Sequence, residues 1–139
     1  MPSRTTLRLW LPPLLWTAVI LAASGASLSS ANTAPWLAKL INAFYPISPE
    51  AFAIANFMIR KAAHLTGYGI LGALVFRAIR AERPSWEVRW AIAAIVFSAV
   101  VASLDEWHQS FVQSRTGTPQ DVLLDTLGAT LAQVLFFRA

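Results

Sequence analysis

Cysteine is missing from this chain of 139 residues, and charged residues are scarce. Without cysteine the protein has no disulfides, no thiolate metal ligands and no cysteine nucleophile. Charged residues make up 13% of the chain, against about 25% in an average soluble domain. Hydrophobic residues make up 56%, and the mean hydropathy is +0.53. The net charge of +4 comes from basic residues scattered at the ends of apolar blocks, not gathered on one face. We therefore expect a membrane protein that binds no nucleic acid.

The apolar residues form four blocks that are typical of membrane helices. A bilayer core requires about 20 helical residues, with a range of about 17 to 25. The runs are continuous and lack the alternation of a transmembrane β-barrel. The sequence predicts one all-α domain over residues 1–139, an integral membrane bundle of four transmembrane helices plus a short outer-face amphipathic helix. The four spans are expected at about residues 9–28, 61–79, 89–108 and 120–137.

The basic residues predict the orientation of these spans. Seven of the 11 arginines and lysines fall on the side of the two termini, and four fall on the other side. Cytoplasmic loops are enriched in these residues, so both termini are expected in the cytoplasm. One alternative stays open. Arg4, Arg8 and the apolar run up to Ser24 also fit a cleaved signal peptide, which would leave three spans.

The connection after the first span is rich in aromatic residues. An apolar stripe at helical spacing follows Pro35 and consists of Trp36, Leu37, Leu40, Ile41 and Phe44. This stripe predicts a short helix lying on the outer membrane surface, or alternatively a lid packed over the other helices. Ser48-Pro49-Glu50 is typical of a helix start. That helix is expected to run through Arg60 and continue as the second span.

Ionisable side chains occur where three spans reach one membrane face. Such groups are costly at membrane depth and usually face a bundle interior or a watery cavity. In the second span, Lys61, His64 and Tyr68 share one helix face. Taken singly, Lys61 could be a snorkelling anchor and His64 a hydrogen-bonded core residue. The shared face becomes a candidate site because carboxylates from other spans are expected at the same level.

The third span ends in a polar run. Asp105 can share an inward face with His108 and Gln109, which lie three and four residues further on. Glu106 points about 100° away from Asp105 in a helix, so the two carboxylates are not interchangeable. Alternatively, Asp105 and Glu106 form a solvated helix end. The helix dipole opposes that placement, because carboxylates at a C-terminus are unfavourable.

The fourth span begins at Thr118-Pro119-Gln120-Asp121, a typical helix start. Asp121 can therefore be a capping group near the positive helix end. Asp125 lies one turn deeper and is out of reach of capping, so a buried acid there should be paired or protonated. We expect His64, Arg115 and Asp125 to meet Asp105 or Glu106 in the fold.

These residues resemble the motif of the VanZ-like membrane proteins. The resemblance covers about residues 60–134. Asp125 departs from the pattern, since many members carry asparagine there, which puts the need for a charge in doubt. Gln133 also lies in a region where a second glycine is common. The positions that carry the resemblance are Lys61, His64, Tyr68, Asp105, Glu106, Gln109, Phe111, Arg115, Asp121, Asp125 and Gly128.

The resemblance implies a small helical protein of the bacterial cytoplasmic membrane, in a family whose founding member is associated with teicoplanin resistance. It suggests a polar cavity on the outer face that binds an amphipathic or lipid-linked anionic ligand. A lipid-linked cell-wall precursor, a lipoglycopeptide and membrane lipids are the expected partners. The candidate ligand-binding residues are Arg60, Lys61, His64, Tyr68, Asp105, Glu106, Gln109, Arg115, Asp121 and Asp125.

Two other functions remain open. The chain could be an enzyme acting on a lipid-linked substrate, with His64 or His108 and the carboxylate of Asp105 or Glu106 as acid and base. Alternatively, the polar groups form a structural network that locks the helices together. No H-E-x-x-H pattern occurs, so neither a metal nor another cofactor is expected. The oligomeric state is left open.

Overall fold

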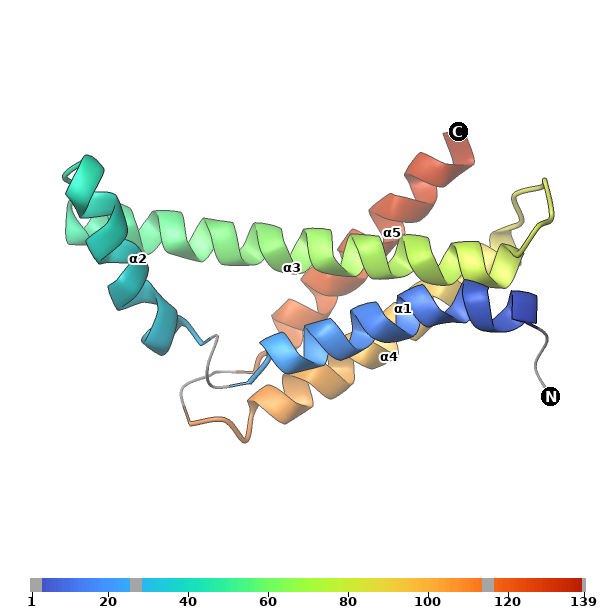
Figure 1. Ribbon diagram of the computed structural model, residues 1–139, viewed down its shortest axis with the longest axis horizontal. Helices are drawn as coiled ribbons and strands as arrows, with labels where there is room; N and C mark the ends of the chain where they lie inside the picture. Colours follow the sequence, from blue (N-terminus) through green and yellow to red (C-terminus); the bar gives the residue numbers. More distant parts are fainter. Residues whose placement is uncertain (1–3, 26–28, 114–116, 139) are drawn as a thin grey trace.

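The computed structural model describes residues 4–25, 29–113 and 117–138, and these contain five helices and no strand. The all-α prediction is therefore confirmed over the described residues. Figure 1 shows α3 as the longest helix, with the others arranged along it. In chain order the helices are α1 (Arg4–Ala23), α2 (Ser30–Phe44), α3 (Pro49–Arg80), α4 (Val88–Gln109) and α5 (Pro119–Arg138).

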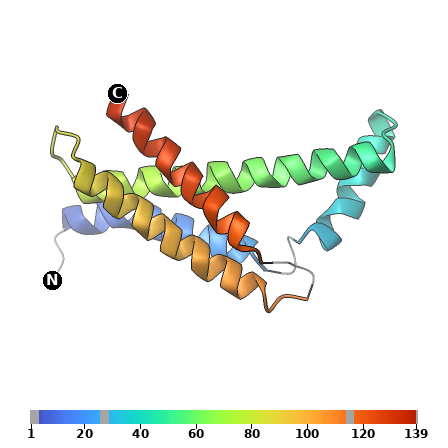
Figure 2. The ribbon, with the colours of Figure 1, turned by 180° about the vertical axis from the view of Figure 1, so that it is seen from behind.

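Helix α3 organises the fold. It begins as predicted, with the Ser48 hydroxyl accepting a hydrogen bond from the Ala51 N–H at 3.2 Å and Pro49 in the first turn. It then continues without a break through Arg60 to Arg80. Helices α1, α4 and α5 pack against its C-terminal part, whereas its N-terminal part extends past them beside α2 (Figures 1 and 2).

Within the described residues, three helices are long and apolar enough to cross a membrane: Thr6–Ala23, Pro49–Arg80 and Val88–Gln109. Three of the four expected spans thus correspond to helices that could cross a membrane, whereas α5, the fourth, does not meet the same criterion. The first span also ends earlier than the expected residue 28. Its helix stops at Ala23, where Ser24 and Gly25 form a turn.

Small residues bring α3 and α5 together. A Cβ added to Gly72 would lie 3.0 Å from the backbone of Ala129, and one added to Gly128 would collide with the Leu65 carbonyl oxygen. Close helix approach of this kind is common in membrane proteins. Gly67 of α3 does not take part in this contact, because a Cβ there would meet nothing within 4 Å.

The helix ends fall into two groups. The start of α1, the end of α5 and the connection between α3 and α4 lie at one end of the bundle, as seen from both sides in Figures 1 and 2. The end of α1, the end of α4 and the start of α5 lie at the other end. This arrangement agrees with the predicted grouping of the two termini on one side.

Helix α2 lies beside the N-terminal part of α3 and has no buried residues. Its side chains Trp36, Leu40 and Phe44 are 81%, 60% and 85% exposed. The lid alternative is therefore wrong, since a lid would bury this stripe against the other helices. An apolar stripe that faces outward from the protein is typical of a helix lying at a membrane surface.

Candidate functional site at the end of the helix bundle

One face of α3 carries three polar side chains, and each of them contacts a carboxylate from another helix. The three pairs are Lys61 with Asp121, His64 with Asp125 and Tyr68 with Asp105. Two of these carboxylates come from successive turns of α5, and the third comes from α4. The prediction that Lys61, His64 and Tyr68 share one face of a helix is therefore confirmed.

Asp105 is the most connected of the buried acids. It is 1% exposed, and its carboxylate accepts hydrogen bonds from the Ser24 hydroxyl, the Tyr68 hydroxyl at 3.2 Å and the Gln109 amide at 3.1 Å. These donors come from α4 itself, from α3 and from the turn after α1. Asp105 is thus held by three neutral donors. The alternative of a solvated helix end is wrong for this residue.

Glu106 faces a different neighbour, as the 100° rotation from Asp105 predicts. It is 6% exposed, and its Oε2 accepts a hydrogen bond from the Thr118 N–H at 2.9 Å. Its Oε1 is buried and has no hydrogen-bond partner among the described residues. A Cβ added to Gly117 would collide with the Glu106 carbonyl oxygen, so the chain before α5 runs directly against the end of α4.

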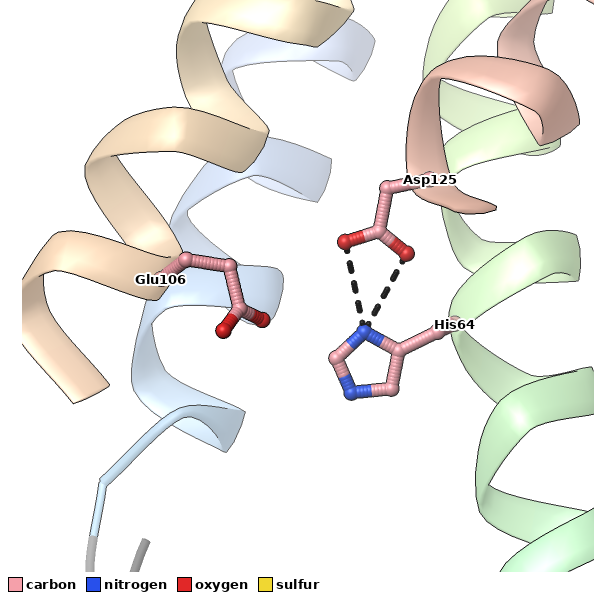
Figure 3. Close-up of side chains that lie close together, drawn as sticks. All are labelled: His64, Glu106 and Asp125. Carbon is pink, nitrogen blue, oxygen red and sulfur yellow. Dashed lines mark hydrogen bonds and ion pairs between the residues drawn. The ribbon is translucent and has the colours of Figure 1, made fainter. Parts of the chain in front are cut away.

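His64 lies between the carboxylates of α4 and α5. Its Nδ1 is 3.2 and 3.4 Å from the two carboxylate oxygens of Asp125, which is fully buried. Figure 3 shows the Glu106 side chain pointing toward this pair from the opposite side. Ligand atoms of His64, Glu106 and Asp125 all lie within 4.8 Å of one another, a separation that a metal ion can bridge. The expected meeting of His64 and Asp125 with a carboxylate of α4 is therefore confirmed for Glu106, although a metal site made of these three residues was not expected.

Two other expected site residues do not join this cluster. His108 is exposed, so it does not share the inward face of α4 with Asp105 and Gln109. Of these two residues, Gln109 shares the inward face with Asp105, because it lies four residues further along the helix. His108 lies three residues further and points to the outer side. The role of His108 as acid or base loses its structural basis. Arg115 lies outside the described residues.

A pocket of about 210 Å³ opens beside the cluster. Arg60, His64, Tyr68 and Asp105 contribute its polar lining together with Ser24, whereas the rest of the lining is apolar and comes from Ile20, Ala23, Ala63 and Gly67. The pocket lies between α1 and α3, with Asp105 of α4 reaching it. Lys61 and Asp121 form their ion pair outside it, with side chains 33% and 18% exposed.

Sequence reasoning missed the contribution of the first helix. Ser24 is buried and bonds Asp105, and the Trp16 indole N–H donates to the Gly67 carbonyl oxygen at 2.8 Å. A serine at the end of an apolar block was a usable signal, because it lies at the same depth as the other polar groups. No feature of the sequence indicated the hydrogen bond of the Trp16 indole, since any neighbouring carbonyl oxygen could accept a hydrogen bond from it.

The fold and the cluster define a class: a small helical membrane protein with buried acids, a histidine and a pocket at one end of its bundle. The family model for VanZ/LLP1 matches residues 9–139, nearly the whole chain, so this protein belongs to the VanZ/LLP1 family. The family match extends the sequence resemblance from residues 60–134 to the first helix and α2. Comparisons with curated proteins and with solved structures found no match.

Proposed function

We propose that the protein binds the anionic headgroup of an amphipathic or lipid-linked molecule in the pocket beside Asp105. The observation that carries the proposal is the mixed lining of this pocket. Arg60 and His64 offer donors to an anionic group, while Ile20, Ala23 and Ala63 offer an apolar wall. Arginine recognises phosphate and carboxylate groups through paired N–H donors. A volume of about 210 Å³ suits a headgroup better than a whole lipid.

The buried carboxylates give the site its rigidity. Asp105 fixes Tyr68 and Gln109 through hydrogen bonds, and Asp125 holds the ring of His64. A binding site needs such support, because side chains that are already oriented lose less entropy on binding. The acids thus act as positioning groups for the donors that face the ligand.

The proposed orientation places this end of the bundle at the outer face of the bacterial cytoplasmic membrane, with both termini inside. The distribution of basic residues supports it. Because the chain has no cysteine, a single introduced cysteine can report on each side. Ala43→Cys on α2 should react with a membrane-impermeant maleimide in intact cells, and Glu82→Cys should not. The reverse pattern would move the pocket to the cytoplasmic side.

Ligand binding is tested with a polyprenyl phosphate and the uncharged polyprenyl alcohol of the same length. The purified protein in detergent should retain the phosphate and not the alcohol in native mass spectrometry. Ala63→Trp should abolish retention, because the indole occupies the pocket. Ala62→Trp is the matched control, since Ala62 is exposed and does not line the pocket. Equal retention by both variants would contradict the proposal.

The same site gives the family's link to glycopeptide tolerance a physical basis. A protein that binds a lipid-linked precursor or the lipid tail of teicoplanin at the outer face would change the amount of antibiotic that reaches its target. Cells that express the Ala63→Trp variant should then be as sensitive to teicoplanin as cells without the protein. Cells that express Ala62→Trp should keep the tolerance of the wild type.

A second candidate function is catalysis on the bound lipid-linked molecule. The observation that favours it is the His64–Asp125 pair beside the pocket, because an imidazole held by a carboxylate is suited to general base catalysis. Incubation of the protein with a polyprenyl diphosphate, followed by mass spectrometry of the lipid, distinguishes the two functions. Unchanged lipid after a long incubation indicates binding alone.

A further inference from the structure

The Glu106 carboxylate is the one part of the cluster that the binding proposal leaves unexplained. Burial of a carboxylate oxygen without a partner is expensive, and such groups in native proteins usually have a ligand, a water or an ion beside them. Glu106 is 6% exposed, and its Oε1 has no hydrogen-bond partner among the described residues. In Figure 3 this carboxylate faces His64 and Asp125.

The local structure holds Glu106 in this position. The Thr118 N–H binds Oε2, and the close contact between Gly117 and the Glu106 backbone fixes the chain that supplies this N–H. Carboxylates that bind metals are commonly held by such outer hydrogen bonds. One oxygen of Glu106 is therefore oriented by the protein, and the other is available to a ligand.

The distances fit a shared cation. Two ligand atoms that are each about 2 Å from one ion lie at most about 4 Å apart. The ligand atoms of His64, Glu106 and Asp125 lie within 4.8 Å of one another, and the pair His64 Nδ1 and Asp125 Oδ1 is at 3.2 Å. Small side-chain rotations would be needed to bring all three ligand atoms within this limit. A bound cation would also relieve the repulsion between the two buried carboxylates.

We infer that His64, Glu106 and Asp125 bind one divalent metal ion such as Zn²⁺ or Mn²⁺. One imidazole nitrogen and two carboxylate oxygens suit these metals, and three protein ligands leave positions open for water or an anionic group. His64 also lines the pocket, so the ion would have a route of entry from there. The inference goes beyond the proposed binding function and holds whether or not the pocket takes a lipid.

Zn²⁺ titration of the chelator-treated protein in detergent tests this inference by isothermal calorimetry. The wild type should bind one equivalent, and Glu106→Gln should weaken binding at least tenfold. His64→Ala should weaken it similarly, whereas His108→Ala should not, since His108 is exposed and away from the cluster. The comparison of these two histidine variants distinguishes metal binding at the cluster from nonspecific metal binding by any histidine.

A second measurement covers variants that fold poorly. Zn²⁺ should raise the thermal unfolding temperature of the wild type and of His108→Ala, because a ligand that binds only the folded state stabilises it. It should not raise that of Glu106→Gln. Folded wild-type protein that binds neither Zn²⁺ nor Mn²⁺ overturns the inference. So does Zn²⁺ binding that Glu106→Gln and His64→Ala leave unchanged.

Discussion

The contact between α3 and α5 has two halves of opposite character. Near the start of α5 it is polar, with Lys61 paired with Asp121 and His64 with Asp125. Toward the end of α5 it is mostly apolar, and the rings of Phe76 and Phe136 stack with centroids 5.5 Å apart. Its one buried polar side chain among the described residues, Gln133, donates a hydrogen bond to the Gly72 carbonyl oxygen at 3.0 Å. The apolar half gains free energy from packing, whereas burial of ionised groups costs free energy that their pairing only partly returns.

This difference separates the elements that maintain the fold from those available for function. The apolar half continues into the core of α3 and α4, where Leu71, Val75 and Ala94 have no exposed surface. The polar half borders the pocket and contains Asp125, also without exposed surface. If packing alone were required, apolar residues would serve as well in the polar half. Stability is therefore expected to rest mainly on the apolar half, and the proposed ligand recognition on the polar half.

Removal of a core ring should have the largest effect on stability. Phe76 is 1% exposed, so Phe76→Ala should lower the free energy of unfolding by about 3 to 5 kcal/mol. Phe44→Ala is the control, because this ring is 85% exposed and its loss should change stability by about 0.5 kcal/mol at most. Thermal unfolding in detergent measures both. Equal effects would show that the apolar half does not dominate stability.

A methyl group added where α3 and α5 cross should have a smaller effect on stability. Gly128→Ala forces a Cβ into the Leu65 carbonyl oxygen, and overpacking of this kind costs about 1 to 3 kcal/mol. Gly67→Ala places its Cβ where nothing lies within 4 Å, and alanine favours the helix by about 1 kcal/mol. The two variants should therefore shift the unfolding temperature in opposite directions. Shifts in the same direction would contradict the close α3–α5 contact.

The partly exposed ion pair should have the smallest effect. The Lys61 and Asp121 side chains are 33% and 18% exposed, and a pair near the surface contributes about 0 to 1 kcal/mol. Lys61→Met should therefore change the free energy of unfolding by less than about 1 kcal/mol. A loss of about 3 to 5 kcal/mol is the cost of breaking a buried pair. A loss that large would place Lys61 in a structural network and blur the division between the halves.

Local patterns in the sequence were sufficient to predict much of the helical structure. Ser48-Pro49 predicts the start of α3 because a cap and a first-turn proline act within a few residues. The face of Lys61, His64 and Tyr68 follows from helical periodicity. Hydrophobicity predicted four spans, but α5 does not meet the criterion for a candidate span, because Asp121, Asp125 and Gln133 lower its mean hydropathy. Asp125 and Gln133 are buried.

Contacts between residues of different helices were harder to predict. The positions of Glu106 and Ser24 depend on how helices cross, which local spacing does not determine. Glu106 was separated correctly from Asp105 by rotation about the helix. The sequence predicted that one of these two carboxylates would meet His64 and Asp125, but it did not indicate that Glu106 would be the one. The inward position expected of His108 failed for a related reason. A three-residue step allows either side of a narrow helix interface, and the packing of α4 leaves His108 exposed.

The most direct test of a ligand site at the polar end is the affinity for polyprenyl phosphate when a pocket cation is neutralised. Arg60→Gln should weaken binding of the phosphate at least tenfold and leave the unfolding temperature close to that of the wild type. Lys39→Gln, on exposed α2, is the matched control and should bind like the wild type. If Arg60→Gln retains full affinity for the phosphate, or loses stability and affinity together, the polar end is not the headgroup site.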